Sequence, residues 1–260
     1  MASSFDLSGR TALVTGSTRG IGAGIAAGLA RAGATVVLHG RNPARLRGAQ
    51  QKLRDMLRDE GCEASVSGVS FDVTDYDAMH AALGQVEQDV GAIDVLVNNA
   101  GIQLRAPLVE LSLSGWTQVL ETNLTASFVL AQRVAHGMLE RRAGKIINLC
   151  SVQTRLVRAT TAPYAAAKAG LASLTRTMCA EWARAGIQVN AIAPGYIDTD
   201  LNAALVGDAA FSAWVVERTP ARRWGQPSDL AGPAVFLASS ASDFVNGQVI
   251  YLDGGMTAVI

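Results

Sequence analysis

Short hydrophobic runs rich in β-branched residues alternate with longer segments of helical periodicity along the chain. Apolar runs of this length are typical of strands that fill a sheet. They predict strands at 11–15, 35–39, 64–71, 95–98, 145–151, 188–193 and 248–252. The segments between them predict helices at 20–32, 43–59, 75–90, 116–141, 163–184 and 227–238.

Strands that are apolar on both faces and are separated by helices are typical of a parallel sheet that helices cover on both sides. The alternation continues without a linker rich in proline or serine, so the sequence predicts one doubly wound α/β domain of seven parallel strands over residues 1–260. The segment at about 194–224 follows neither period. A long irregular insertion in a compact domain usually carries function, and we expect a substrate loop or lid there.

Composition narrows the class of protein. In 260 residues, 22 basic residues balance 22 acidic ones, which does not favour nucleic acid or an anionic membrane as a partner. Cys62, Cys150 and Cys179 have no CxxC spacing, which indicates reduced thiols. The N-terminus has no apolar core of a signal peptide, and no long apolar run occurs elsewhere. We therefore expect a cytoplasmic protein that binds neither membrane nor nucleic acid.

A glycine-rich stretch, TGSTRGIG at 15–22, follows the first predicted strand directly. Glycine lets the backbone turn tightly and approach a pyrophosphate, whose charge then lies at the N-terminus of the next helix. Three residues separate Gly16 from Gly20, and one separates Gly20 from Gly22, so the spacing differs from GxGxxG. Its position between a strand and an alanine-rich helix favours a dinucleotide cofactor over a purely structural turn.

The end of the second predicted strand indicates which dinucleotide. It reads His39-Gly40-Arg41-Asn42, without the carboxylate that commonly holds the ribose 2′-hydroxyl of NAD. Arg41, together with Arg19 of the glycine stretch, can instead accommodate a 2′-phosphate. The sequence predicts NADP(H), and the alternative is that both arginines are ordinary surface residues.

Tyr164 and Lys168 are four residues apart in a predicted helix and therefore share one face. A neighbouring ammonium group favours the phenolate, which lowers a tyrosine pKa from about 10. Ser151 ends a predicted strand, at the edge where open α/β sheets bind ligands. Its hydroxyl can bond a substrate carbonyl while Tyr164 handles the proton. Such a Tyr–Lys pair alone is more typical of exposed helix surface, but the glycine stretch and Ser151 favour catalysis.

These motifs, with Asn98-Asn99-Ala100-Gly101, Asn123 and Pro194-Gly195 with Thr199, resemble the classical short-chain dehydrogenase/reductase family over residues 9–255. The resemblance implies a Rossmann-like fold, an NADP-dependent oxidoreductase and a homotetramer.

The resemblance also implies roles for individual residues. Tyr164 would be the general acid/base, and Ser151 would orient the carbonyl or hydroxyl. Lys168 would bind the nicotinamide ribose and lower the pKa of Tyr164, and Asn123 would hold a water in a proton relay. The implied cofactor contacts are Gly16, Ser17, Arg19, Gly20, Ile21, Gly22, Arg41, Asn42, Asp72, Val73, Asn99, Ala100, Gly101, Tyr164, Lys168, Pro194, Ile197 and Thr199.

Several stretches are similar to one branch of that family, the gluconate 5-dehydrogenases or 5-ketogluconate reductases. They are NNAGIQLRAPLVEL, KIINLCSVQTRLVR, APGYIDTDL, RTPARRWGQPSDL and FVNGQVIYLDGG. The branch implies the pair D-gluconate and 5-keto-D-gluconate as product and substrate.

The chemistry of nearby residues agrees with an anionic, hydroxylated substrate. Arg105 follows NNAG, and Gln153, Arg155 and Arg158 follow Ser151. Guanidinium groups can pair with a carboxylate, and the amide of Gln153 can bond hydroxyls. The predicted substrate contacts are Arg105, Ser151, Gln153, Arg155 and Tyr164. Alternatively, the arginines hold subunit or lid contacts, and the enzyme reduces another sugar or polyol, a 3-oxoacyl thioester or a small cyclic ketone.

Other classes of protein fit less well. Ser151 lies in LCSVQ rather than in the GxSxG of a serine hydrolase, and His39, His80 and His136 are scattered. The sequence contains no HExxH and no cluster of cysteine and histidine, so we expect no metal site. A cofactor-binding regulator without activity is disfavoured because the serine, tyrosine and lysine are all present.

Overall fold

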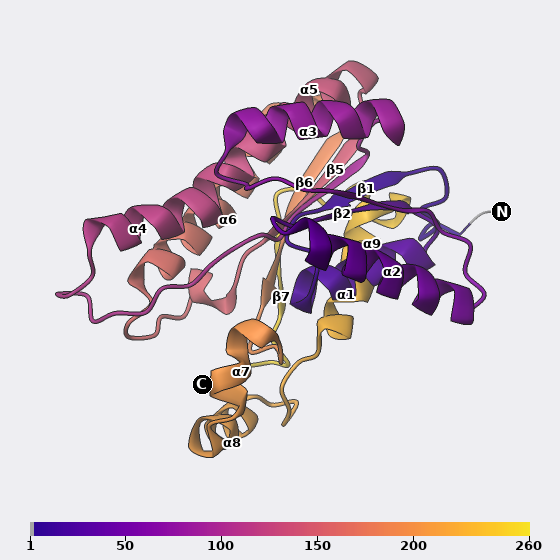
Figure 1. The fold of residues 1–260 in the computed structure, drawn as a ribbon. Helices are drawn as coiled ribbons and strands as arrows, with labels where there is room; N and C mark the ends of the chain where they lie inside the picture. Colours follow the sequence, from indigo (N-terminus) through magenta and orange to yellow (C-terminus); the bar gives the residue numbers. More distant parts are fainter. Residues whose placement is uncertain (1–2) are drawn as a thin grey trace.

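Seven parallel strands form one sheet in the computed structural model, which describes residues 3–260 (Figure 1). Their order is β3-β2-β1-β4-β5-β6-β7. The strands are β1 (Thr11–Val14), β2 (Thr35–His39), β3 (Val66–Val69), β4 (Val95–Asn98), β5 (Gly144–Leu149), β6 (Ile187–Pro194) and β7 (Val249–Leu252). The order reverses between β1 and β4, and at such a switch point the carboxyl ends of the strands open a crevice for ligands. The predicted fold class is confirmed.

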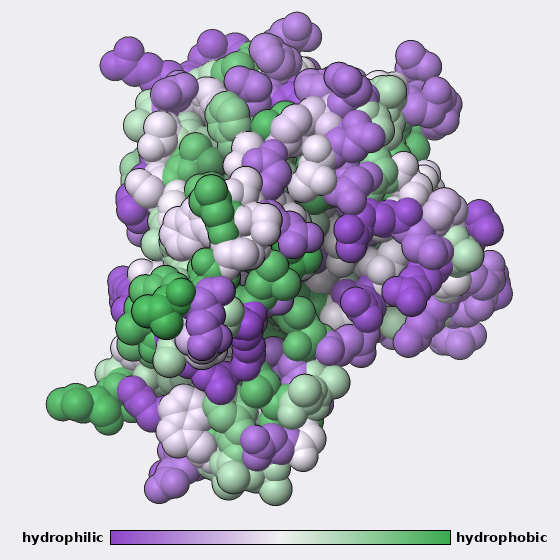
Figure 2. All heavy atoms as spheres, turned by 60° about the vertical axis from the view of Figure 1, so that its left-hand side comes forward, coloured by the Kyte–Doolittle hydropathy of each residue, from purple (hydrophilic) through white to green (hydrophobic). Residues whose placement is uncertain are grey.

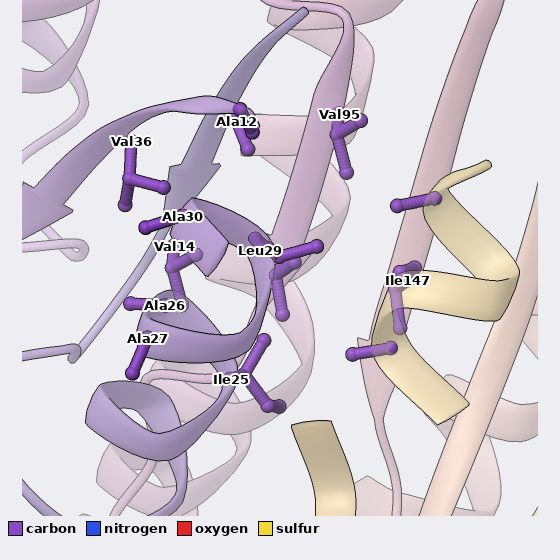
Figure 3. Packing of buried hydrophobic residues seen from close by; sticks show 14 of the residues in the cluster. Ala12, Val14, Ile25, Ala26, Ala27, Leu29, Ala30, Val36, Val95 and Ile147 are labelled. Carbon is purple, nitrogen blue, oxygen red and sulfur yellow. The ribbon is translucent and has the colours of Figure 1, made fainter. Parts of the chain in front are cut away.

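One face of the sheet is covered by α1 (Gly20–Arg31), α2 (Pro43–Asp59) and α9 (Ala231–Ala238) (Figure 1). Ala12 and Val14 of β1 point into this layer, where they pack in one cluster with Ile25 and Leu29 of α1 (Figure 3). The intervening Leu13 points to the opposite face, because successive side chains of a strand alternate. With both faces buried, the strand reads as a continuous apolar run in the sequence.

The opposite face is covered by α3 (Tyr76–Asp89), α5 (Ala126–Arg141) and α6 (Ala162–Trp182). Met79 of α3 and Leu130 and Met138 of α5 are fully buried there against Leu13 and Leu96 of the sheet. A shorter helix, α4 (Leu113–Leu120), packs against α6. The helix starts follow their sequence signals: Asn42 caps α2 by accepting from Arg45 N, with Pro43 next in line.

The helix predicted at 116–141 is not continuous. It consists of α4, a π-helical turn at Glu121–Thr125, and α5. Hydrophobic periodicity does not reveal such a turn because one inserted residue leaves the amphipathic pattern of each flanking helix intact. The strand predicted at 64–71 is also shorter, with β3 restricted to Val66–Val69.

The segment 194–224 is more ordered than its sequence indicated. It contains α7 (Ala203–Val206) and α8 (Ala209–Arg218), which project from the sheet beside the C-terminus (Figure 1). Asp208 caps α8 by accepting from the backbone N–H groups of Ala210 and Phe211. Short 3₁₀ turns occur at Val152–Thr154, Ala183–Ala185, Asp200–Asn202, Pro227–Leu230 and Ser240–Ser242. Within residues 3–260, no helix combines the length and apolar character needed to cross a membrane.

A close approach between α1 and α9 generates a stability prediction. A Cβ atom on Gly28 would lie 2.6 Å from Ala231 Cβ and 3.1 Å from Ala231 Cα. We expect Gly28→Ala to lower the free energy of unfolding by about 1–3 kcal/mol, because the two helices would have to separate. Thermal unfolding at equal protein concentration measures the change.

The matched control is Gly84→Ala on α3, where an added Cβ would meet nothing within 4 Å. Alanine replaces glycine in a helix there, so stability should rise by about 0.5–1 kcal/mol. Equal effects of the two substitutions would contradict the packing described for α1 and α9.

Candidate functional site

A cavity of about 1520 Å³ runs along the carboxyl ends of the strands, from the glycine loop to α8. In Figure 2, hydrophobic and hydrophilic side chains meet in a hollow between the main body and the lobe that projects below it. The cavity wall includes every cofactor and substrate residue predicted from the sequence except Ser17, while Asn123 also lies outside it. One space therefore brings together groups spread over most of the chain.

The glycine loop is fastened to β4 by Asn99. The amide Nδ2 of Asn99 donates to the carbonyl oxygens of Thr15 (2.7 Å) and Gly16 (3.1 Å). In return, Thr15 Oγ1 accepts from the backbone N–H groups of Asn99 and Ala100. The loop is thus preshaped from the neighbouring strand, and α1 begins beyond it without a side-chain cap. Its first N–H groups are available to an anionic ligand.

His39 fastens the same loop to β2, a role that its sequence position did not reveal. Its Nδ1 accepts from Gly16 N at 3.0 Å, and its Nε2 lies 3.1 Å from the carbonyl oxygen of Phe71. These two partners assign the proton to Nε2. Burial lowers the pKa of His39 to about 4, so the ring is neutral at pH 7. A single histidine at a strand end carries no motif, and only its contacts identify it.

Ser17 does not face the cavity. Its hydroxyl donates to the carbonyl oxygen of Val14 at 2.7 Å and accepts from the backbone N–H of His39 at 2.9 Å. Both partners belong to the sheet, and Ser17 is buried. The Ser17 hydroxyl joins β1 and β2 and does not line the cavity, and the predicted contact of Ser17 with the cofactor stays a prediction.

The two arginines predicted to receive a phosphate both reach the cavity, and each meets a carboxylate. Arg41 Nη1 lies 3.2 Å from Asp72 Oδ2, and Arg19 Nη1 lies 3.3 Å from Asp200 Oδ2. The four side chains are exposed, and such ion pairs contribute little stability. A phosphate that arrives can therefore take over the guanidinium groups at small cost.

Ser151, Tyr164 and Lys168 meet where β5 ends. Ser151 caps the turn Val152–Thr154 by accepting from Gln153 N at 3.2 Å, and its hydroxyl is close enough to that of Tyr164 to favour the phenolate. Lys168 lies one turn further along α6, with Nζ 5.6 Å from the centre of the Tyr164 ring. Its Nζ donates to the carbonyl oxygen of Leu149 at 2.5 Å. The predicted face of α6 therefore forms.

Burial dominates the protonation of this group. It raises the pKa of Tyr164 to about 12, although the hydrogen bond with Ser151 acts in the opposite direction. It lowers the pKa of Lys168 to about 8. Burial disfavours the charged forms of both groups, and the ammonium group of Lys168 bonds the Leu149 carbonyl. The predicted lowering of the Tyr164 pKa by Lys168 stays a prediction.

Asn123 lies in the π-helical turn and is fully buried. Its Oδ1 accepts from Ile102 N and its Nδ2 donates to Ile102 O, each at 2.8 Å. The side-chain amide is therefore fully used to hold Ile102, and the predicted part of Asn123 in a proton relay stays a prediction.

Arginines gather at the far end of the cavity. The Arg155 guanidinium lies 4.4 Å from the centre of the Tyr251 ring, and that of Arg158 lies 4.3 Å from the centre of the Phe211 ring. Partial burial, and then the charge of Arg158, lower the pKa of Arg105. Among residues 3–260, none of these three arginines has a carboxylate within ion-pair distance.

An aromatic cluster from the segment 194–224 forms part of the same wall. The ring of Tyr196 packs edge-on against Phe211, Trp214 and Trp224 at 5.5–5.8 Å between ring centres. Sequence reasoning missed these residues, although the concentration of aromatic side chains in a segment without a clear period was an available signal. The cluster gives α8 an apolar attachment to the end of β6.

Comparisons with known proteins extend these observations. A family model described as Enoyl-(Acyl carrier protein) reductase matches residues 16–257. Gluconate 5-dehydrogenase of Gluconobacter oxydans (strain 621H) is 51% identical, over 97% of this chain and 96% of that protein. The 5-keto-D-gluconate 5-reductase of Escherichia coli (strain K12) is 48% identical, over 98% of both.

A solved structure agrees with these relatives. The crystal structure of a gluconate 5-dehydrogenase from Burkholderia cenocepacia J2315, in complex with NADP and tartrate, is 53% identical. Its TM-score is 0.92 over 98% of both chains. With its seven-stranded sheet, its glycine loop and the meeting of Ser151, Tyr164 and Lys168, the chain belongs to the short-chain dehydrogenase/reductase family.

Proposed function

We propose that this chain is an NADP-dependent oxidoreductase that interconverts D-gluconate and 5-keto-D-gluconate by reversible hydride transfer. One observation carries the proposal: Ser151, Tyr164 and Lys168 share a cavity with three arginines that have no acidic partner in residues 3–260. Hydroxyl groups beside a lysine suit carbonyl chemistry, and guanidinium groups suit a carboxylate. The names of the relatives supply the same substrate pair.

The residues around the glycine loop fit NADP(H). A Cβ on Gly16 would lie 3.0 Å from Ala100 Cα, so only glycine keeps this part of the wall open. The uncapped N-terminus of α1 suits a pyrophosphate, and Arg41 and Arg19 suit the 2′-phosphate. The predicted cofactor set is therefore proposed to hold it, with Ser17 acting behind the cavity wall by joining β1 and β2. When bound, the nicotinamide supplies or accepts the hydride at C4.

The chain's own groups are proposed to move the proton and to hold the carbonyl. Because its pKa is raised, Tyr164 carries its proton at neutral pH and can donate it to the oxygen that gains charge during reduction. The Ser151 hydroxyl holds that same oxygen. Lys168 lies beneath the tyrosine ring, where its charge favours a developing phenolate during oxidation. Asn123 positions Ile102, and its part in a proton relay is kept as a proposal.

At the substrate end, Arg105 and Arg155 are proposed to pair with the sugar-acid carboxylate. The Gln153 Oε1 atom accepts from Thr161 Oγ1 at 2.8 Å, and this bond leaves the Gln153 amide hydrogens for substrate hydroxyls. The runner-up function is reduction of another ketone, which the aromatic cluster around Tyr196 favours because it adds apolar surface to the same cavity.

Three coarser properties are also proposed. The segment 194–224 acts as a lid of the single domain, since its helix α8 lines the cavity. If binding of NADP leaves the rate of hydrogen exchange in α8 unchanged, this proposal is wrong. A homotetramer would cover exposed Leu113, Phe128 and Phe244, and sedimentation velocity tests it. Three unpaired cysteines suit a reducing cytoplasm, and cell fractionation tests that location.

The first experiment measures the initial rate of NADPH oxidation with 5-keto-D-gluconate, beside neutral ketones and a 3-oxoacyl thioester. We expect turnover confined to the keto-sugar acid. Turnover of another ketone alone would overturn the proposed substrate and leave the family unchanged.

Tyr164→Phe should lower kcat by about 10²-fold or more, because no group then donates the proton, while NADPH still binds. Unchanged kcat would remove Tyr164 from the chemistry.

Cofactor choice is tested by Arg41→Ala. The substitution should raise KM for NADPH and leave KM for NADH nearly unchanged, because only NADPH carries the 2′-phosphate. Arg45→Ala, on the neighbouring turn of α2, is the matched loss of an arginine from the same rim of the cavity. Equal changes for both cofactors in Arg41→Ala would contradict the assignment.

The ionisation of Lys168 predicts a pH profile. Its pKa of about 8 means that the free enzyme loses this charge as pH rises through 8, while Tyr164 stays protonated until about 12. We expect kcat/KM for ketone reduction to be flat below pH 8 and to fall above it. Lys168→Arg, which stays charged, should remove that limb even if the rate is lower. A limb that persists in the variant would assign it to another group.

A further inference from the structure

Two buried polar atoms of residues 3–260 have no hydrogen-bond partner: Asn98 Oδ1 and Gln103 Nε2. Asn98 lies inside the protein, where its Nδ2 donates to Ser127 O and to Asn148 Oδ1 between the sheet and α5. Gln103 lies in the wall of the large cavity. Buried amides almost always have partners, so an unpaired one on a residue of the cavity wall needs an explanation.

The backbone around Gln103 is fixed at both ends. Asn123 holds Ile102 through both its N–H and its C=O, each at 2.8 Å. On the other side, Ala106 N donates to Thr160 O at 3.1 Å. Thr160 adopts φ +70°, a conformation that β-branched residues rarely adopt. Backbone strain of this kind persists where surrounding contacts enforce it, and it concentrates at functional sites.

This fixed segment places Gln103 among the groups already assigned to the substrate. Arg105 belongs to the same segment, and the loop that holds Thr160 also carries Gln153 and Arg155. Thr161, next to Thr160, holds the Gln153 amide. The strained corner therefore joins two loops that each present one glutamine and one or more arginines to a single cavity.

We propose that Gln103 contacts the substrate directly, through a hydrogen bond from its amide to a hydroxyl group of the sugar acid. This inference rests on the proposed function and adds a specificity-determining residue to it. A hydroxyl both donates and accepts, so it satisfies the buried end of the amide in either orientation of the side chain.

The same contact selects against substrates without hydroxyl groups. An acyl chain or a plain cyclic ketone would leave the buried end of the Gln103 amide without a partner, as it is in the free protein, whereas a hydroxyl group would pair it. Sites built to bond a substrate hydroxyl reject analogues that lack it, because their own buried polar groups are then left unpaired. Gln103 thereby offsets the apolar surface that the aromatic cluster contributes.

The test compares Gln103→Leu with wild type in three measurements. The value of kcat/KM for 5-keto-D-gluconate should fall about tenfold to hundredfold, equivalent to about 1.4–2.8 kcal/mol at 1.4 kcal/mol per tenfold. That for a neutral ketone without hydroxyls should stay unchanged or rise. The Kd of NADPH should not change, which excludes a general distortion of the site. The control is Gln88→Leu, the same replacement on the exposed surface of α3.

A binding measurement separates this inference from the proposed function. Calorimetry of D-gluconate with the NADPH-loaded enzyme requires no turnover. Weaker binding in Gln103→Leu, by the same tenfold to hundredfold, supports the contact. Equal binding in the variant and in wild type overturns the role of Gln103 and leaves the proposed function intact. If the loaded wild type binds no gluconate, both the proposed function and the role of Gln103 fall.

Discussion

The hydrogen bonds that join the ends of β1, β2 and β4 are the constraint on which the rest of the site depends. The strand order reverses between β1 and β4, so the loops that follow these two strands run in opposite directions and leave a crevice between them. Asn99 and His39 supply the missing connections by bonding the backbone of Thr15 and Gly16. A loop that otherwise has the freedom of glycine therefore reaches the cavity in one shape, and part of the entropic cost of ligand binding is met during folding.

Around Ser151, Tyr164 and Lys168, desolvation determines which groups are charged. Lys168 is buried and Tyr164 is half-buried, and the pKa of each shifts toward its neutral form. The phenol of Tyr164 therefore keeps its proton at neutral pH, while Lys168, with a pKa of about 8, loses its charge only slightly above neutral pH. Proximity of a cation alone would have produced the opposite shift in tyrosine, so the depth of the α6 face matters as much as the spacing of its residues.

The sequence was sufficient where function depends on local spacing and insufficient where it depends on contacts between distant segments. Strand periodicity predicted the sheet, and four-residue spacing predicted that Tyr164 and Lys168 share a face. The inward turn of Ser17 and the engagement of Asn123 with Ile102 follow from partners 22 and 21 residues away, which no local pattern encodes. The π-helical turn was missed for a related reason, since it changes hydrogen bonding without altering the hydrophobic period. The role of His39 was missed for the same reason, because the sequence does not show whether a histidine is buried and neutral or exposed.

Charge and surface character divide the cavity into two regions, and that division relates the site to its chemistry. At the cofactor end, Arg19 and Arg41 rest against carboxylates, and a phosphate must displace weak, exposed ion pairs. At the substrate end, Arg155 and Arg158 rest against aromatic faces, which hold a guanidinium group in place without neutralising its charge. Stacking leaves the N–H donors of both groups without a carboxylate partner in residues 3–260. The apolar cluster of α8 is therefore compatible with an anionic substrate, because the ring of Phe211 packs against the guanidinium group of Arg158 and leaves its charge in place.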